Sequence, residues 1–355
     1  MSKDGLKDAR ILGIETSCDE TAAAVVDNGR IVLSNVVASQ AEMHSKYGGV
    51  FPEVASREHI RTIYPVVQEA LQQAQLTIED VDAIAVTRGP GLPGSLVVGL
   101  NMAKGLALSS GKPLIGVNHV EAHLYSAWIN PSPHEDSNSK PQFPLLALIV
   151  SGGHSELVLM EDHLTYNRLG GTLDDAAGEA FDKIARLLGL GYPGGPKIQA
   201  VSEAGDPEAY KFPRAWLEGT WNFSFSGLKT AVLHKVRNIR EAQGLDPNDE
   251  KAILPVADLA ASFQAAVVDV LVTKARYAAQ EFNAVEMLVA GGVSANKSLR
   301  ALVSKDVPAK VHIPPLKYCT DNAAMVAAAG YYRYALGYRD GLEIDAMPNW
   351  PLSEL

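Results

Sequence analysis

Two histidines four residues apart, His119 and His123, form the clearest pattern in the chain that could do chemistry. This spacing puts both imidazoles on one face of a helix, the arrangement by which a helix presents two ligands to one metal ion. For an isolated pair, two surface or capping histidines are the commoner interpretation. In zinc proteases a Glu follows the first His directly, whereas Val120 stands there in this chain. The residues therefore do not favour a metalloprotease.

A metal site needs a third ligand, and Asp321 is the best candidate. Two His and one carboxylate would leave coordination positions open, as a catalytic site does. Two alternatives remain at this segment: Thr320 can cap a following helix, with Asp321 meeting the helix dipole. Cys319 is a softer alternative ligand, although a buried structural thiol is the commoner use of such a residue.

Two polar turns between apolar stretches, residues 15–21 and 151–154, could hold phosphate oxygens through hydroxyls and backbone N–H groups. Neither has the Gly-Lys-Ser/Thr ending of a Walker A loop or opens a helix as a dinucleotide fingerprint does. Each alone is a plain hairpin turn, but a facing pair in a duplicated fold would clamp phosphate. Asp182, deep in a helix predicted from Asp174 to Leu188, can accept ribose hydroxyls or pair with a neighbouring Lys or Arg.

The elements around these residues occur twice. Each half begins with strands joined by a polar turn, at 10–14 and 21–26, and again at 145–150 and 155–160. Each half also has a strand that enters a glycine-containing loop and then a helix, at 82–108 and at 286–303. Strands alternating with helices predict an α/β fold with a largely parallel central sheet plus antiparallel hairpins. A final helix, predicted at 322–336, can pack on either half.

Composition bounds the class of protein. The chain has 355 residues and 47% hydrophobic residues, which excludes general disorder and suggests two domains. Its 31 Lys and Arg against 41 Asp and Glu give a net charge of −10, which argues against an indiscriminate binder of the nucleic-acid backbone. Two cysteines cannot form a disulfide framework. We expect a soluble, cytoplasmic protein that does not associate with a membrane, because no signal segment or long apolar run is evident.

The domain boundaries follow from residues 130–141, a stretch rich in Pro, Ser and charged residues. We predict a first domain at 1–130, an exposed linker at 131–144, a second domain at 145–337 and a tail at 338–355.

Taken together, the motifs resemble those of the universal tRNA threonylcarbamoyladenosine transferases, in the bacterial and organellar branch once called O-sialoglycoprotein endopeptidases. The resemblance runs from Ile11 to about Arg339. Any one motif is weak, but their number and order make the match specific. The motifs are at 13–21, 52–57, 89–92, 119–123, 150–154, 174–183, 192–196, 223–229, 291–296 and 320–322.

The resemblance implies an actin-like, Hsp70-like duplicated two-domain ATPase fold. It implies one divalent metal ion, iron or zinc, on His119, His123 and Asp321, with ATP and Mg²⁺ as further ligands. It also implies a nucleotide or threonylcarbamoyl-adenylate held by Ile149, Val150, Ser151, Gly152, Gly153, Asp182, Gly195 and Asn296. This chain departs from the family at Gln199, where the family often has an acidic residue that contacts ribose.

The implied reaction transfers a threonylcarbamoyl group from threonylcarbamoyl-adenylate to the exocyclic amine of the adenosine 3′ of the anticodon, in tRNAs reading ANN codons. The metal, held by its protein ligands, would act as a Lewis acid on the carbamoyl or phosphate oxygens. The group that removes the amine proton stays open among a donor phosphate oxygen, Glu15 and a metal-bound hydroxide. Implied partners are an inactive paralogue subunit and a small ATPase, or a second copy in a homodimer. A small-molecule kinase of the same fold and a non-catalytic nucleotide-switch subunit are the alternatives.

One short stretch is basic against the acidic whole. It contains Lys229, Lys235, Arg237 and Arg240 and no acidic residue between them. A solvated helix face is the commoner interpretation of such a run. With the family resemblance, we predict that these four residues contact tRNA phosphates.

Overall fold

The computed structural model describes residues 7–129, 141–246 and 252–352. The chain forms two compact units. Unit 1 comprises Met1–Phe143, Met160–Asn167 and Pro314–Leu355, and unit 2 comprises Pro144–Leu159 and Arg168–Ile313. Most of the linker predicted at 131–144 lies outside the described residues. The segment from Pro314 onward, which the predicted boundaries counted mainly in the second domain, belongs to unit 1.

Unit 1 is built on a five-stranded sheet of order β3-β2-β1-β4-β5. Strands β1 (Arg10–Glu15), β2 (Glu20–Asp27) and β3 (Ile31–Ser39) form an antiparallel meander. Strands β4 (Ala83–Gly89) and β5 (Leu114–Asn118) continue the sheet in parallel from β1. β1, β4 and β5 are almost wholly buried, as expected for parallel strands covered by helices on both faces.

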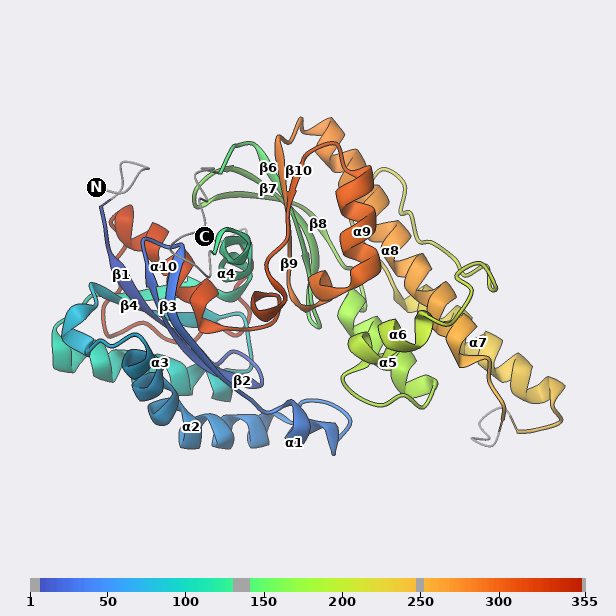
Figure 1. Cartoon of the computed structure of the whole chain (residues 1–355), viewed down its shortest axis with the longest axis horizontal. Coiled ribbons are helices and arrows are strands. Elements are labelled where there is room, and N and C mark those ends of the chain that lie inside the picture. Colours follow the sequence, from blue (N-terminus) through green and yellow to red (C-terminus); the bar gives the residue numbers. More distant parts are fainter. Residues whose placement is uncertain (1–6, 130–140, 247–251, 353–355) are drawn as a thin grey trace. The chain divides into compact units, whose positions relative to one another are not determined.

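Helices cover both faces of this sheet (Figure 1). α2 (Pro52–Gln73) and α3 (Pro93–Ser110) pack on one face, where their apolar residues join those of β1 and β4 in the core of the unit. α10 (Ala323–Ala335) packs on the other face against β1, β2 and β4. A Cβ at Gly13 would lie 2.4 Å from the Ala323 carbonyl oxygen, so the close approach of α10 to β1 requires glycine there. The short α1 (Ala41–Ser45) precedes α2.

Unit 2 repeats the strand order of unit 1. Its strands are β6 (Leu145–Val150), β7 (Ser155–Asp162), β8 (Thr165–Gly171), β9 (Glu286–Ala290) and β10 (Lys310–His312). They are ordered β10-β9-β6-β7-β8, with β6, β9 and β10 parallel. Read from the other edge, this is the order of the first sheet. The predicted α/β fold and its duplication are therefore confirmed at the level of topology.

The helices of unit 2 surround a second apolar core. They are α5 (Ala177–Leu187), α6 (Gly194–Ser202), α7 (Ser226–Ala242), α8 (Val256–Glu281) and α9 (Lys297–Asp306). Among the described residues, α8 alone is long and apolar enough to cross a membrane, but 67% of its most apolar stretch is buried within the protein. α8 supplies much of the core of unit 2, which accounts for its composition.

Candidate metal centre and nucleotide-binding turn

The predicted histidine pair begins the short helix α4 (His119–Tyr125), which follows β5 directly. The side chain of Asn118 caps α4 by accepting hydrogen bonds from the backbone N–H groups of Val120 and Glu121, at 2.9 and 3.2 Å. This cap fixes the start of the helix, so both histidines lie at the carboxyl end of the buried strand β5. The two imidazole rings meet edge to face, with centroids 4.7 Å apart.

Asp321 meets both histidines. Its Oδ1 lies 3.5 Å from His119 Nε2 and 3.2 Å from His123 Nε2. One donor atom from each of the three side chains lies within 4.8 Å of the others. The cap of α10 is Asn322, which accepts from the Met325 N–H at 3.1 Å, rather than Thr320 as the alternative interpretation proposed. Because Asn322 caps the helix, Asp321 stands outside it and faces the histidines.

The residues present fit a metal ion. His123 is 1% exposed, and neither of its ring nitrogens makes a hydrogen bond although Nε2 is close to Asp321. A buried imidazole without a hydrogen-bond partner is costly unless a ligand completes it. Two imidazole nitrogens and one carboxylate suit zinc or iron. Cys319 does not join the group, since its buried thiol is directed at the carbonyl oxygens of Pro314 and Pro315.

Glu15 supports this group from behind. Its Oε2 lies 3.1 Å from His119 Nδ1 and accepts a hydrogen bond from the Thr87 hydroxyl at 2.6 Å. Burial acts to lower the pKa of His119, but the carboxylates of Asp321 and Glu15 outweigh it and raise this pKa to about 9. Burial likewise acts to raise the pKa of Glu15, and the charge of His119 lowers it overall. Because Nδ1 of His119 is hydrogen-bonded to this carboxylate, Nε2 is the ring nitrogen that can bind a metal ion.

Sequence reasoning missed a second buried carboxylate near the histidines, which lies on α4 whereas Glu15 ends β1. Glu121 is fully buried, receives Arg333 Nε at 2.6 Å and accepts the hydroxyl of Tyr166 at 2.8 Å. The ion pair ties α4 to α10 and so couples the helix of the histidines to the helix that follows Asp321. The available signal was an Arg within the otherwise apolar run of α10, since a buried cation calls for a buried partner.

The predicted phosphate turn of unit 2 joins β6 to β7. The Ser151 hydroxyl accepts from the backbone N–H groups of Gly153 and His154, at 3.3 and 3.1 Å. Gly152 and Gly153 are exposed, and a Cβ on either would meet nothing within 4 Å. Behind the turn, a Cβ at Gly178 would lie 2.5 Å from the Ser151 carbonyl oxygen, so α5 begins in direct backbone contact with it.

The other predicted nucleotide residues lie on elements that adjoin this turn. Ile149 pairs with Ala290 in the parallel ladder, so the loops after β6 and β9 leave the same edge of the sheet. This edge, at the carboxyl ends of parallel strands, is where open α/β sheets bind ligands. Asp182, on α5, accepts the Gly194 N–H at 2.7 Å, which fixes α6 next to α5 and leaves the following Gly195 with open space around its Cα.

Asn296 and Gln199 are both held by hydrogen bonds. Asn296 caps α9 through the Leu299 N–H at 3.0 Å and donates its amide to Gln264 at 2.7 Å. Gln199 Oε1 accepts the Lys297 N–H at 2.7 Å, which leaves its amide nitrogen as a donor. Sequence reasoning missed Gln264, a polar residue inside the apolar run of α8 and 6% exposed. A lone amide in such a run is the signal of a buried hydrogen-bond network.

One prediction near α7 needs correction, and the tRNA contact stays a prediction. The helix predicted from Asp174 begins at Ala177, because Asp174 instead accepts backbone N–H groups of Phe225 and Ser226 at the start of α7. The predicted tRNA-contacting residues do not form one exposed face. Lys229 pairs with Asp175 at 2.7 Å, and Arg240 is only 8% exposed. Lys235 and Arg237 are half-buried.

Known proteins resemble this chain over nearly its full length. The family model described as tRNA N6-adenosine threonylcarbamoyltransferase matches residues 31–328. The protein of that name from Thermomicrobium roseum is 54% identical over 353 residues, covering 96% of each chain. The protein of the same name from Geobacillus kaustophilus is 52% identical over 352 residues, covering 98% of each chain.

Solved structures of lower identity share the fold. Component A of (R)-2-hydroxyglutaryl-CoA dehydratase from Acidaminococcus fermentans has a TM-score of 0.53 at 14% identity, covering 92% of this chain and 99% of its own. HypF from T. kodakarensis has a TM-score of 0.60 at 16% identity, covering 93% of this chain and 48% of its own. The predicted actin-like ATPase fold is confirmed by these likenesses and the family match. On the match of its sequence and its fold, the chain belongs to the tRNA N6-adenosine threonylcarbamoyltransferase family.

Proposed function

We propose that this protein transfers the threonylcarbamoyl group of threonylcarbamoyl-adenylate to N6 of the adenosine 3′ of the anticodon, in tRNAs reading ANN codons. The observation that carries the proposal is the joint presence of the family match and the group of buried His119 and His123 with the half-buried Asp321. A small-molecule kinase of the same fold has no need for this group.

His119, His123 and Asp321 would hold the metal, iron or zinc. A bound metal supplies Lewis acidity at the carbamoyl or phosphate oxygens of the donor. As ligands, neither histidine serves as a free base. Glu15 is fully buried, and His119 and Thr87 already occupy its Oε2. These contacts favour a positioning role, in which Glu15 holds the Nδ1 proton of His119, over proton removal from the substrate amine.

Unit 2 would bind the adenylate, or ATP with Mg²⁺. Its phosphate would approach the exposed backbone of Gly152 and Gly153, following Ile149, Val150 and Ser151, because no side chain stands in the way there. Gly195 would allow a similar close approach, and Asp182 and Asn296 would contact the sugar. Gln199 would donate its amide to a ribose hydroxyl, where an acidic residue would accept.

The substrate tRNA would contact α7 through Lys235 and Arg237, since Lys229 and Arg240 are engaged or buried. The proposed partners are an inactive paralogue subunit with a small ATPase, or a second copy of the chain. The proposed location is the cytoplasm.

Incubation of the metal-loaded protein with threonylcarbamoyl-adenylate and unmodified tRNA tests the proposal. The reactions run with and without candidate partner proteins, and mass spectrometry of digested tRNA detects the modified nucleoside. We expect product with at least one combination, and no product in any of them would contradict the transferase assignment.

A pair of histidine variants tests the ligands. His123→Ala should lose metal content and transfer together. The matched variant His312→Ala removes a half-buried imidazole on β10, beside Glu286, and should keep both. Full metal occupancy in His123→Ala would refute the ligand assignment.

A further inference from the structure

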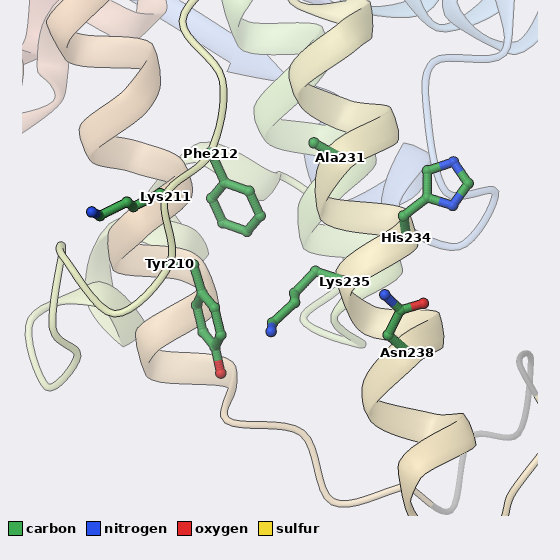
Figure 2. Close-up of a pocket in the computed structure, with 7 residues that line it drawn as sticks. All are labelled: Tyr210, Lys211, Phe212, Ala231, His234, Lys235 and Asn238. Atoms are coloured by element: carbon green, nitrogen blue, oxygen red, sulfur yellow. The ribbon is translucent and has the colours of Figure 1, made fainter.

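One face of α7 forms the wall of a pocket in unit 2. Four of its residues, Ala231, His234, Lys235 and Asn238, recur at positions i, i+3, i+4 and i+7 and so share one face of the helix. The opposite wall is the segment Tyr210, Lys211 and Phe212, and the cavity between the walls measures about 280 Å³. Figure 2 shows the side chains of Tyr210, Phe212 and Lys235 directed toward one another, while Lys211 points away.

The segment that carries Tyr210 has no helix or strand, yet contacts with α8 hold it. The Asp206 N–H donates to Asp258 at 2.9 Å, and the Tyr210 N–H donates to the Ser262 hydroxyl at 3.1 Å. Arg214 forms an ion pair with Asp269 at 2.6 Å. Three anchors within nine residues fix the wall in place, so a ligand would meet a formed pocket rather than order a loose loop.

The pocket combines aromatic surface with positive charge. Lys235 Nζ lies 4.8 Å from the centroid of the Tyr210 ring, within cation–π range. Phe212 is 6% exposed and closes the pocket from within the core. None of the residues that line the pocket is acidic. Burial and the charge of Asp258 raise the pKa of Tyr210, so its hydroxyl stays neutral.

We propose that this pocket receives one unpaired nucleotide of the substrate RNA, an inference that rests on the proposed function. An aromatic ring, an ammonium group and an exposed amide are the groups by which proteins hold an unstacked base and its phosphate. The volume of about 280 Å³ lies just below the usual range of ligand pockets, so the pocket has room for one nucleotide at most. A paired base cannot leave its helix to enter such a hollow without losing its partner. The base stacks on Tyr210, Lys235 meets the phosphate, and Asn238 contacts the base edge.

Fluorescence anisotropy with a labelled anticodon stem–loop RNA tests the pocket directly. Tyr210→Leu should weaken binding about tenfold, and Tyr210→Phe, which keeps the ring, should bind within about twofold of the wild type. Lys235→Gln should weaken binding and reduce the slope of log affinity against log salt by about one. The matched variant Lys305→Gln removes an exposed positive charge of unit 2 on α9 and should leave the affinity unchanged.

Two further measurements distinguish a site for an unpaired nucleotide from a general anion-binding site. A fully paired RNA duplex of equal length should bind with the same affinity to the wild type and to Tyr210→Leu, because it offers no free base. Equal stem–loop binding by Tyr210→Leu and the wild type, with matching thermal unfolding and metal content, would overturn the proposal. The proposal would also be overturned if Tyr210→Leu lost heparin binding to the same extent as stem–loop binding, since the site would then bind any anion.

Transfer by the wild-type protein is measured separately. If the wild type shows no transfer but its affinity for the stem–loop depends on Tyr210, the proposed function is wrong and the nucleotide pocket is still supported. Transfer without that dependence would defeat the pocket alone.

Discussion

The two sheets share one strand order but carry opposite kinds of site. In unit 1, the strand β5 leads into α4, and the candidate metal centre consists of two buried histidines and the half-buried Asp321. In unit 2, the strand β6 leads into an exposed glycine turn, and the proposed phosphate site consists of backbone groups. In the shared strand order β6 corresponds to β1 and not to β5, so the two candidate sites follow different strands of the same scaffold, and the residues after each strand decide the chemistry.

The contrast extends to how each site tolerates change. The candidate centre in unit 1 depends on charged groups within one largely buried cluster, so removal of one member leaves the others uncompensated. The turn in unit 2 depends on the absence of side chains, so an added methyl group is the natural perturbation. Variants of the two sites should therefore fail in different assays.

The largest expected effect is loss of the carboxylate ligand. Asp321→Ala should lower metal affinity at least about 100-fold, because the buried histidines then lack the third donor. Metal content after dialysis and isothermal titration with Zn²⁺ or Fe²⁺ measure the change. Thr320→Ala, at the exposed neighbouring residue, should bind metal normally. Equal affinity in the two variants would remove Asp321 from the site.

The next effect concerns the carboxylate behind the site. Glu15→Gln should lower metal affinity by about 10-fold to 100-fold, because a neutral amide holds the His119 imidazole less firmly than a carboxylate does. Competition with a chelator measures the affinity. Glu179→Gln, a carboxylate on the surface of α5, is the control. If metal affinity stays unchanged in Glu15→Gln while transfer disappears, Glu15 acts on substrate instead of on His119.

A smaller effect is expected at the turn of unit 2. Gly178→Ala should lower the free energy of unfolding by about 1–3 kcal/mol, since its Cβ would overlap the Ser151 backbone. Gly152→Ala meets nothing and should leave that free energy unchanged, but it should weaken adenylate binding if phosphate approaches there. Chemical denaturation and nucleotide titration measure the two quantities. A stable Gly152→Ala with full adenylate affinity would exclude the turn as the phosphate site.

Much of this arrangement was predictable from the sequence, for a physical reason. Buried strands are short apolar runs ended by polar or glycine-rich turns, so the central strands of both sheets and the histidine helix could be located from their residue pattern. The strands β5, β8 and β10 were not among those predicted. The position of Asp321 beside the two histidines was predictable because few residue types bind metal, although it is about 200 residues away in sequence.

Pairings between distant side chains were not predictable. The run from Lys229 to Arg240 contains basic and no acidic residues, yet the acid that neutralises Lys229 is Asp175, on a segment before α5. The helix phase then separates Lys235 from Arg240. Sequence reasoning missed two other pairs for the same reason, Glu121 with Arg333 and Gln264 with Asn296. A single sequence indicates that a polar residue is buried only when it stands within an apolar run, and it does not indicate the partner.

The smallest expected effect concerns Gln199, where the family resemblance leads us to expect an acidic residue. Its carbonyl oxygen already accepts the first N–H of α9, so in Gln199→Glu one carboxylate oxygen keeps that bond at a helix N-terminus and the other can accept a ribose hydroxyl. We expect adenosine to bind about threefold tighter, the size of one modest hydrogen bond. Gln199→Leu removes both bonds and should bind adenosine more weakly than the wild type. Isothermal titration with adenosine, which carries no phosphate to repel the new charge, measures both variants. Identical affinity in all three proteins would place the ribose away from α6 and leave the glycine turn as the main nucleotide contact of unit 2.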